Sequence, residues 1–115
     1  MNSPQLAAAY EIAKDRAASA IEEAASASAH AAQLRQEKRD FGRLLCNVPY
    51  TPERIAEFNQ MQAEYEAAAK DSERLVEYAA KMTRQAEAAA EALDEAQAQE
   101  FDAAHLRFNV YPELM

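Results

Sequence analysis

The chain has 115 residues and a net charge of −8, and about a quarter of its residues are alanine, with one glycine, four prolines and one cysteine. This composition favours long helices and excludes a disulfide framework, and no apolar run is long enough to predict a membrane-spanning helix. The acidity opposes binding to nucleic-acid phosphates or to an anionic membrane surface.

The first predicted element is a helix over residues 4–45. Ser3 followed by Pro4 predicts an N-cap and a proline at the first helical position. Alternating steps of four and three residues then select a row that is apolar at all but one position. The row is Leu6, Tyr10, Ala13, Ala17, Ala20, Ala24, Ala27, Ala31, Leu34, Lys38, Phe41 and Leu45. A 3.5-residue repeat sustained over this length predicts the seam of a left-handed coiled coil.

The same helix carries a second row of small residues, turned by about 100° from the first. It consists of Ala18, Ile21, Ala25, Ser28 and Ala32. One apolar row is enough to hold one neighbouring helix, so two rows suit a helix that touches two neighbours in a bundle. We therefore expect this row to form an interface between subunits. The alternative is that its alanines only favour helix formation on an exposed face.

A turn is predicted at residues 46–52, "CNVPYTP", which form the one cluster of turn residues in the sequence. Val48 precedes Pro49, and this position disfavours helical geometry. Thr51 and Pro52 then repeat the arrangement of a cap followed by proline. A short connection between two long helices predicts an antiparallel helical hairpin.

The second predicted helix covers about residues 52–105, with an irregular tail at 106–115, so that residues 1–115 form one all-α domain. Its seam is Phe58, Met61, Tyr65, Ala68, Ser72, Leu75, Ala79, Met82, Ala86, Ala89, Leu93 and Ala96. Folding about residues 48–49 places Leu75 near Ala20–Ala24 and Tyr65 near Ala31. Large side chains of the second helix would then face alanines of the first, which allows close packing without overfilling the seam.

In this register the start of the first helix lies opposite Leu93, so the second helix and the tail extend beyond it. Exposed large apolar side chains on this extension would mark a contact surface. We therefore expect a partner to dock there, on Phe101, Leu106, Phe108, Val110, Tyr111 and Leu114. The alternative is that the tail folds back and covers the end of its own hairpin.

No motif in the sequence predicts catalysis or a cofactor. Gly42 stands alone, so there is no glycine-rich phosphate loop. Asp102 and His105 have the spacing of a carboxylate–histidine metal pair, but the glutamates that accompany such pairs in helical bundles are missing. We therefore expect no catalytic residue, no cofactor, no metal and no enzymatic activity.

The single cysteine, Cys46, fits a reducing compartment, and the N-terminal residues lack the features of a signal peptide. We expect a cytoplasmic location or a place in a larger assembly. The predicted function is that of a non-enzymatic structural or assembly protein, a coiled-coil hairpin that oligomerises. Its partners would be itself and another protein, but neither nucleic acid nor membrane. By analogy of class alone, small helical components of phages or virions fit this description.

An alternative function follows from the uneven distribution of charge. Residues 51–115 hold fourteen acidic and six basic side chains, whereas the acidic and basic side chains of residues 1–50 are equal in number. The acidic second helix suits a small protein that regulates or inhibits a partner, such as an adaptor, a chaperone or an inhibitor of an enzyme.

Overall fold

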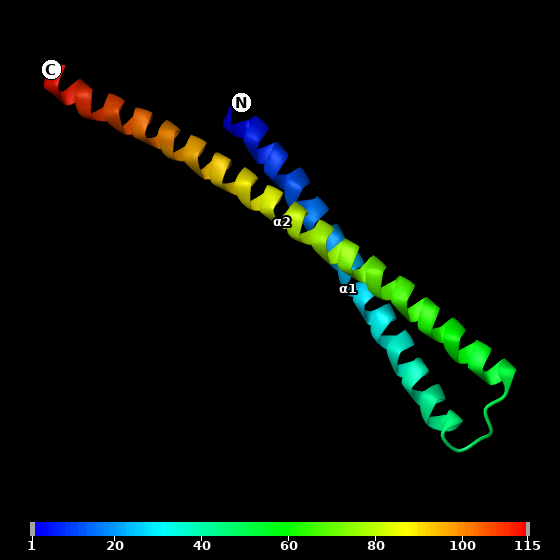
Figure 1. Cartoon of the computed structure of the whole chain (residues 1–115). Coiled ribbons are helices and arrows are strands. Elements are labelled where there is room, and N and C mark those ends of the chain that lie inside the picture. The colour runs from blue at the N-terminus through cyan, green and yellow to red at the C-terminus, as the bar shows by residue number, and fades with distance from the viewer. Residues whose placement is uncertain (1, 115) are drawn as a thin grey trace. The chain divides into compact units, whose positions relative to one another are not determined.

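The computed structural model describes the backbone of residues 2–114 and the side chains of residues 2–104. It contains helix α1, Ser3–Leu45, and helix α2, Pro52–Leu114, joined by the loop of residues 46–51. Figure 1 shows the loop connecting the cyan end of α1 to the green start of α2. The described residues contain no strand. The predicted all-α helical hairpin is therefore confirmed.

Helix α1 starts with a reciprocal pair of hydrogen bonds between Asn2 and Gln5. The Gln5 amide donates to Asn2 Oδ1 over 3.0 Å, and the Asn2 amide donates to Gln5 Oε1 over 3.1 Å. This is a capping box, which satisfies two backbone donors that the first turn leaves without partners. The predicted cap at Ser3 is therefore wrong by one residue, because Asn2 has a suitable partner three residues later. The Ser3 hydroxyl instead donates to Glu100.

The loop is anchored at both ends. After α1, the amides of Cys46 and Asn47 each donate to a carbonyl three residues earlier, over 3.2 Å, and these bonds tighten the last turn. Before α2, Thr51 Oγ1 accepts from the Arg54 amide over 3.2 Å, which confirms the predicted N-cap. The guanidinium of Arg54 also donates to the Pro49 carbonyl over 2.7 Å and holds the loop against the first turn of α2.

Helix α2 ends later than the sequence predicts. The backbone stays helical to Leu114, whereas the prediction ended the helix at about residue 105 and made residues 106–115 an irregular tail. Residues 106–111 contain neither glycine nor proline, so no residue before Pro112 interrupts the helix.

The chain divides into two compact units, and α1 and α2 each contribute to both. Unit 1 combines Met1–Ala17 with Lys81–Met115, and unit 2 is Ala18–Ala80. Inside each unit a segment of α1 lies beside an antiparallel segment of α2.

The two predicted seams are confirmed position by position. Every residue of both seam rows is buried or half-buried. The buried hydrophobic residues are Ala17, Ala20, Ala24, Ala31, Ala79 and Met82. Because five of these six are alanines, the core of each helix pair is thin, and the two backbones can approach closely.

The register of the seam differs from the predicted one by about one helical turn. In unit 2 the Ser28 hydroxyl lies 2.8 Å from that of Ser72, and Lys38 donates a hydrogen bond to Gln62. Nearer the loop, the rings of Phe41 and Phe58 stack with centroids 6.5 Å apart. Leu75 was predicted near Ala20–Ala24, and the observed register aligns it with the Ala24 end of that range and not with Ala20. The pairs Ser28–Ser72 and Lys38–Gln62 are both symmetric about residue 50 and not about residues 48–49.

Candidate functional site

The predicted interface row of α1 lies outside the seam of unit 2. All five of its residues are exposed, and Ile21, its largest side chain, is 52% exposed. The row is Ala18, Ile21, Ala25, Ser28 and Ala32. The helical pair thus leaves this surface of α1 uncovered, which is a precondition for an interface with another chain.

Ser28 shows where the row lies relative to α2. Its hydroxyl hydrogen-bonds with that of Ser72, a seam residue of α2. Residues seven apart on a helix of a coiled coil share one face, so Ile21 lies on the same side of α1 as Ser28. The row therefore follows the edge of α1 that borders α2, and it does not lie on the side opposite the seam.

Helix α2 adds apolar side chains along the same edge. Gln62 accepts the hydrogen bond from Lys38 across the seam, and Ala69 and Val76 follow Gln62 at intervals of seven residues. Val76 is 49% exposed and Ala69 is half-buried. Together these residues make a surface of unit 2 that we call the apolar flank. It consists of Ala18, Ile21, Ala25, Ala32, Ala69, Val76 and Ala80.

The opposite edge of unit 2 is mostly polar and charged, apart from Tyr78. Its α1 side carries Glu23, His30 and Glu37, and its α2 side carries Glu57, Glu64, Asp71 and Tyr78, all exposed. The two edges of one helix pair therefore differ in chemistry. A neighbouring helix would therefore bury more apolar surface on the apolar flank than on the charged edge.

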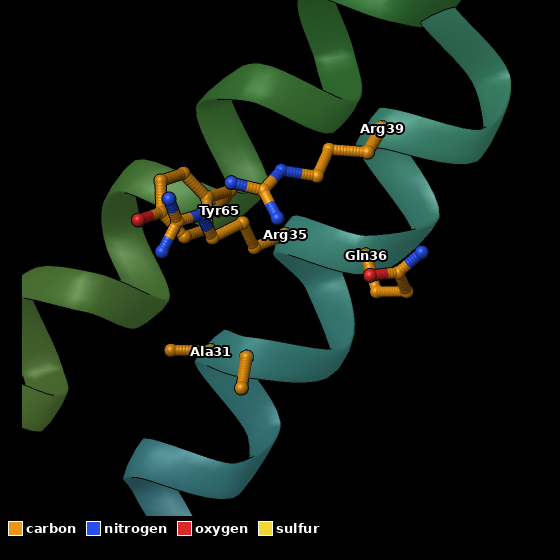
Figure 2. Close-up of a pocket in the computed structure, with 6 residues that line it drawn as sticks. Ala31, Arg35, Gln36, Arg39 and Tyr65 are labelled. Atoms are coloured by element: carbon orange, nitrogen blue, oxygen red, sulfur yellow. The ribbon is translucent and has the colours of Figure 1, made fainter. Parts of the chain in front are cut away.

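A pocket of about 400 Å³ lies where the row of small residues gives way to arginine. It is lined by Ala31, Ala32, Arg35, Gln36, Arg39 and Tyr65. Figure 2 shows Arg35 and Arg39 reaching from α1 towards Tyr65 on α2, while Gln36 points away from that ring. Gln36 instead donates a hydrogen bond to Asp40 over 2.9 Å.

The pocket is strongly cationic in an acidic protein. Besides the two arginines, the ammonium of Lys38 lies 5.4 Å from the centroid of the Tyr65 ring, within range of a cation–π interaction. Arg35 and Arg39 have neither a hydrogen bond nor an ion pair with any described residue. The carboxylate of Asp40 accepts a hydrogen bond from Gln36 and forms an ion pair with Arg43.

The predicted docking surface at the end of α2 is described only in part. Phe101 is 70% exposed. The other five predicted residues lie outside the residues whose side chains are described: Leu106, Phe108, Val110, Tyr111 and Leu114. The bond between Ser3 and Glu100 places the start of α1 opposite Glu100. The predicted extension of α2 therefore starts after Glu100, about two turns later than the expected Leu93.

The described residues offer no metal centre. No group of three or more histidine, cysteine, aspartate or glutamate side chains among them is placed to hold an ion. Cys46 is exposed, and its thiol donates to the Gly42 carbonyl over 3.4 Å. Within the described part of the chain, neither helix has a stretch that is long and apolar enough to span a bilayer.

Comparison with known proteins identifies no relative: no protein-family model, curated protein or solved structure matches this chain.

The sequence did not predict the pocket or the exposed position of Val76. A signal for the pocket was present, because Arg35 and Arg39 continue the steps of three and four that connect Ala25, Ser28 and Ala32. The predicted register placed Tyr65 near Ala31, and both residues do line the pocket, but the approach of Arg35 and Arg39 to Tyr65 was not predicted.

Proposed function

We propose that the protein is a non-enzymatic structural or assembly protein that associates with copies of itself through helix–helix contacts. The observation that carries this proposal is the apolar flank of unit 2, which remains exposed beside a seam whose buried residues are alanines. The helical pair has one face for its own packing and a second face that is chemically suited to another helix.

The energetics favour covering the flank. Fully burying an aliphatic side chain of this size contributes about 1.5–3 kcal/mol, and about half of Ile21 and of Val76 remains exposed. The thin core of the isolated pair supplies little apolar burial per residue. Association through the flank adds burial that the single chain lacks.

The small side chains on the flank also favour the geometry of a bundle. Ala18, Ala25 and Ala32 recur once per seven residues on α1, so a straight partner helix can lie along them at close range. Two hairpins packed in this way form a four-helix bundle, in which each α1 contacts α2 of its own chain and a helix of the second chain.

The experiment compares two neighbouring positions that point in different directions from α1. Ala25→Glu places a carboxylate in the middle of the flank, and Ser26→Glu adds the same charge on a side of the helix outside the flank; both positions are exposed. In sedimentation velocity we expect Ala25→Glu to be monomeric at concentrations where Ser26→Glu and the unmodified protein are oligomeric. Circular dichroism checks that both variants stay helical.

The alternative function, a small acidic protein that acts on a different partner, predicts the opposite result. A monomeric unmodified protein, or equal association of the two variants, would overturn self-assembly through the flank.

A further inference from the structure

The arginine pocket suits an anionic occupant, and no described residue of the same chain supplies one. Arg35 and Arg39 lie one helical turn apart, both exposed and both without an ion-pair partner among the described residues. With Lys38 they place three cations around Tyr65. Guanidinium groups bind carboxylates through paired hydrogen bonds, so two adjacent arginines suit a surface with two or more carboxylates.

Helix α2 presents such a surface in unit 1. Glu87, Glu91 and Asp94 are all exposed, and the structure gives none of them a partner among the described residues. Glu87 and Glu91 have the same four-residue spacing as Arg35 and Arg39. No basic residue occurs between Gln85 and Ala104, and the exposed Ala88 allows another helix to approach closely.

Glu87 and Asp94 also share a face of α2 with the apolar flank. Steps of four and three connect Val76, Ala80, Thr83, Glu87, Ala90 and Asp94. On α1 the corresponding face runs from the small residues to Arg35 and Arg39. Each helix thus carries apolar residues followed by charge, and the two charges are opposite in sign.

We propose that Glu87, Glu91 and Asp94 of a second copy of this chain dock on the arginine pocket. The inference rests on the proposed self-association. It names the charged contact that fixes how the two copies are oriented relative to one another. In a two-fold symmetric dimer the contact occurs twice, because each copy supplies one arginine pair and one acidic set.

Reciprocal charge reversal tests the contact. One variant carries Arg35→Glu and Arg39→Glu; the other carries Glu87→Lys, Glu91→Lys and Asp94→Lys. Alone, each variant has two like-charge contacts in its dimer, so we expect its dissociation constant to rise by about tenfold or more. In an equimolar mixture both contacts again pair opposite charges, and we expect a heterodimer of near-original affinity. Sedimentation velocity, with one variant labelled, measures all three associations.

A matched control makes the same change of charge elsewhere. Lys70→Glu with Lys81→Glu alters two exposed lysines that neither line the pocket nor form an ion pair with a described residue, and we expect it to associate like the unmodified protein. If the unmodified protein dimerises and both reversal variants behave like this control, the contact is overturned while self-association stands. Weakened variants that do not recover on mixing also overturn it, because the arginines then bind some other anion. A monomeric unmodified protein overturns both proposals.

Discussion

The hydroxyls of Ser28 and Ser72 lie 2.8 Å apart and connect α1 to α2 in the middle of unit 2. This is a polar contact at the border of a seam that otherwise consists mainly of alanine and larger apolar residues. Lys38 and Gln62 make a second contact in the same register. Hydrogen bonds depend on geometry more strongly than apolar contacts do, so these two pairs distinguish the observed alignment from one shifted by a turn.

The register predicts which engineered cysteines will crosslink. With Cys46→Ser as background, Ser28→Cys and Ser72→Cys should form a disulfide within one chain, because their side chains already touch. Ala20→Cys with Leu75→Cys, the pair that folding about residues 48–49 would align, should crosslink far less. Non-reducing electrophoresis and mass spectrometry of the monomer band measure both pairs. Preferential crosslinking of the second pair would mean that the seam is aligned differently.

The aromatic pair next to the loop should stabilise the hairpin. Phe41 and Phe58 stack at 6.5 Å with an angle of 19° between the rings, and both are half-buried. Phe41→Ala should lower the free energy of unfolding by about 1–3 kcal/mol, less than the 3–5 kcal/mol of a fully buried ring. Tyr50→Ala is the control, since Tyr50 is 69% exposed in the loop and should change stability little. Urea denaturation followed by circular dichroism measures both variants, and equal losses would contradict a role for the stack.

Gly42 should accept alanine with a gain in stability. A Cβ atom at this position would lie 3.6 Å from Cε2 of Phe58, an ordinary van der Waals contact, and the backbone of Gly42 has no positive φ. Alanine is favoured over glycine inside a helix by about 0.8–1 kcal/mol. Gly42→Ala should therefore raise the midpoint of thermal unfolding, as differential scanning calorimetry would detect. A lower midpoint would show that the helices approach more closely here than the contact distance implies.

The alanines of the seam should not accept larger residues. Ala20 is 2% exposed, so Ala20→Leu must push the helices apart or adopt a strained rotamer, at a cost of about 1–3 kcal/mol. Ala29→Leu adds the same atoms to an exposed position of α1 and should leave stability nearly unchanged. Urea denaturation of the two variants at equal concentration measures the difference. Equal stabilities would contradict a close-packed alanine seam.

The sequence predicts the helices and the seam because their signals are local. The steps from Leu6 to Leu45 and from Phe58 to Ala96 depend only on helical periodicity, and all these positions are buried or half-buried. The N-cap at Thr51 was also predictable from the sequence, because its hydroxyl accepts a hydrogen bond from an amide only three residues later. The predicted cap at Ser3 was wrong because Asn2 and Ser3 are both residue types that cap helices. The Gln5 amide donates to the side chain of Asn2, so Asn2 is the N-cap.

The register and the pocket were less predictable because they depend on contacts between residues far apart in the sequence. A shift of one turn leaves every apolar residue in its row, so periodicity cannot distinguish Ala20 from a residue one turn later as the neighbour of Leu75. The loop conformation and the ring contact of Phe41 with Phe58 decide the alignment. The pocket follows from the alignment, because the alignment brings Tyr65 to the same pocket as Arg35 and Arg39.

The most direct test of self-assembly is sedimentation equilibrium of the unmodified protein from low to high micromolar concentration. We predict a mass that rises with concentration to at least twice that of the single chain, because the apolar flank is then covered by a second copy. A mass equal to that of the single chain throughout the range would contradict the proposed function.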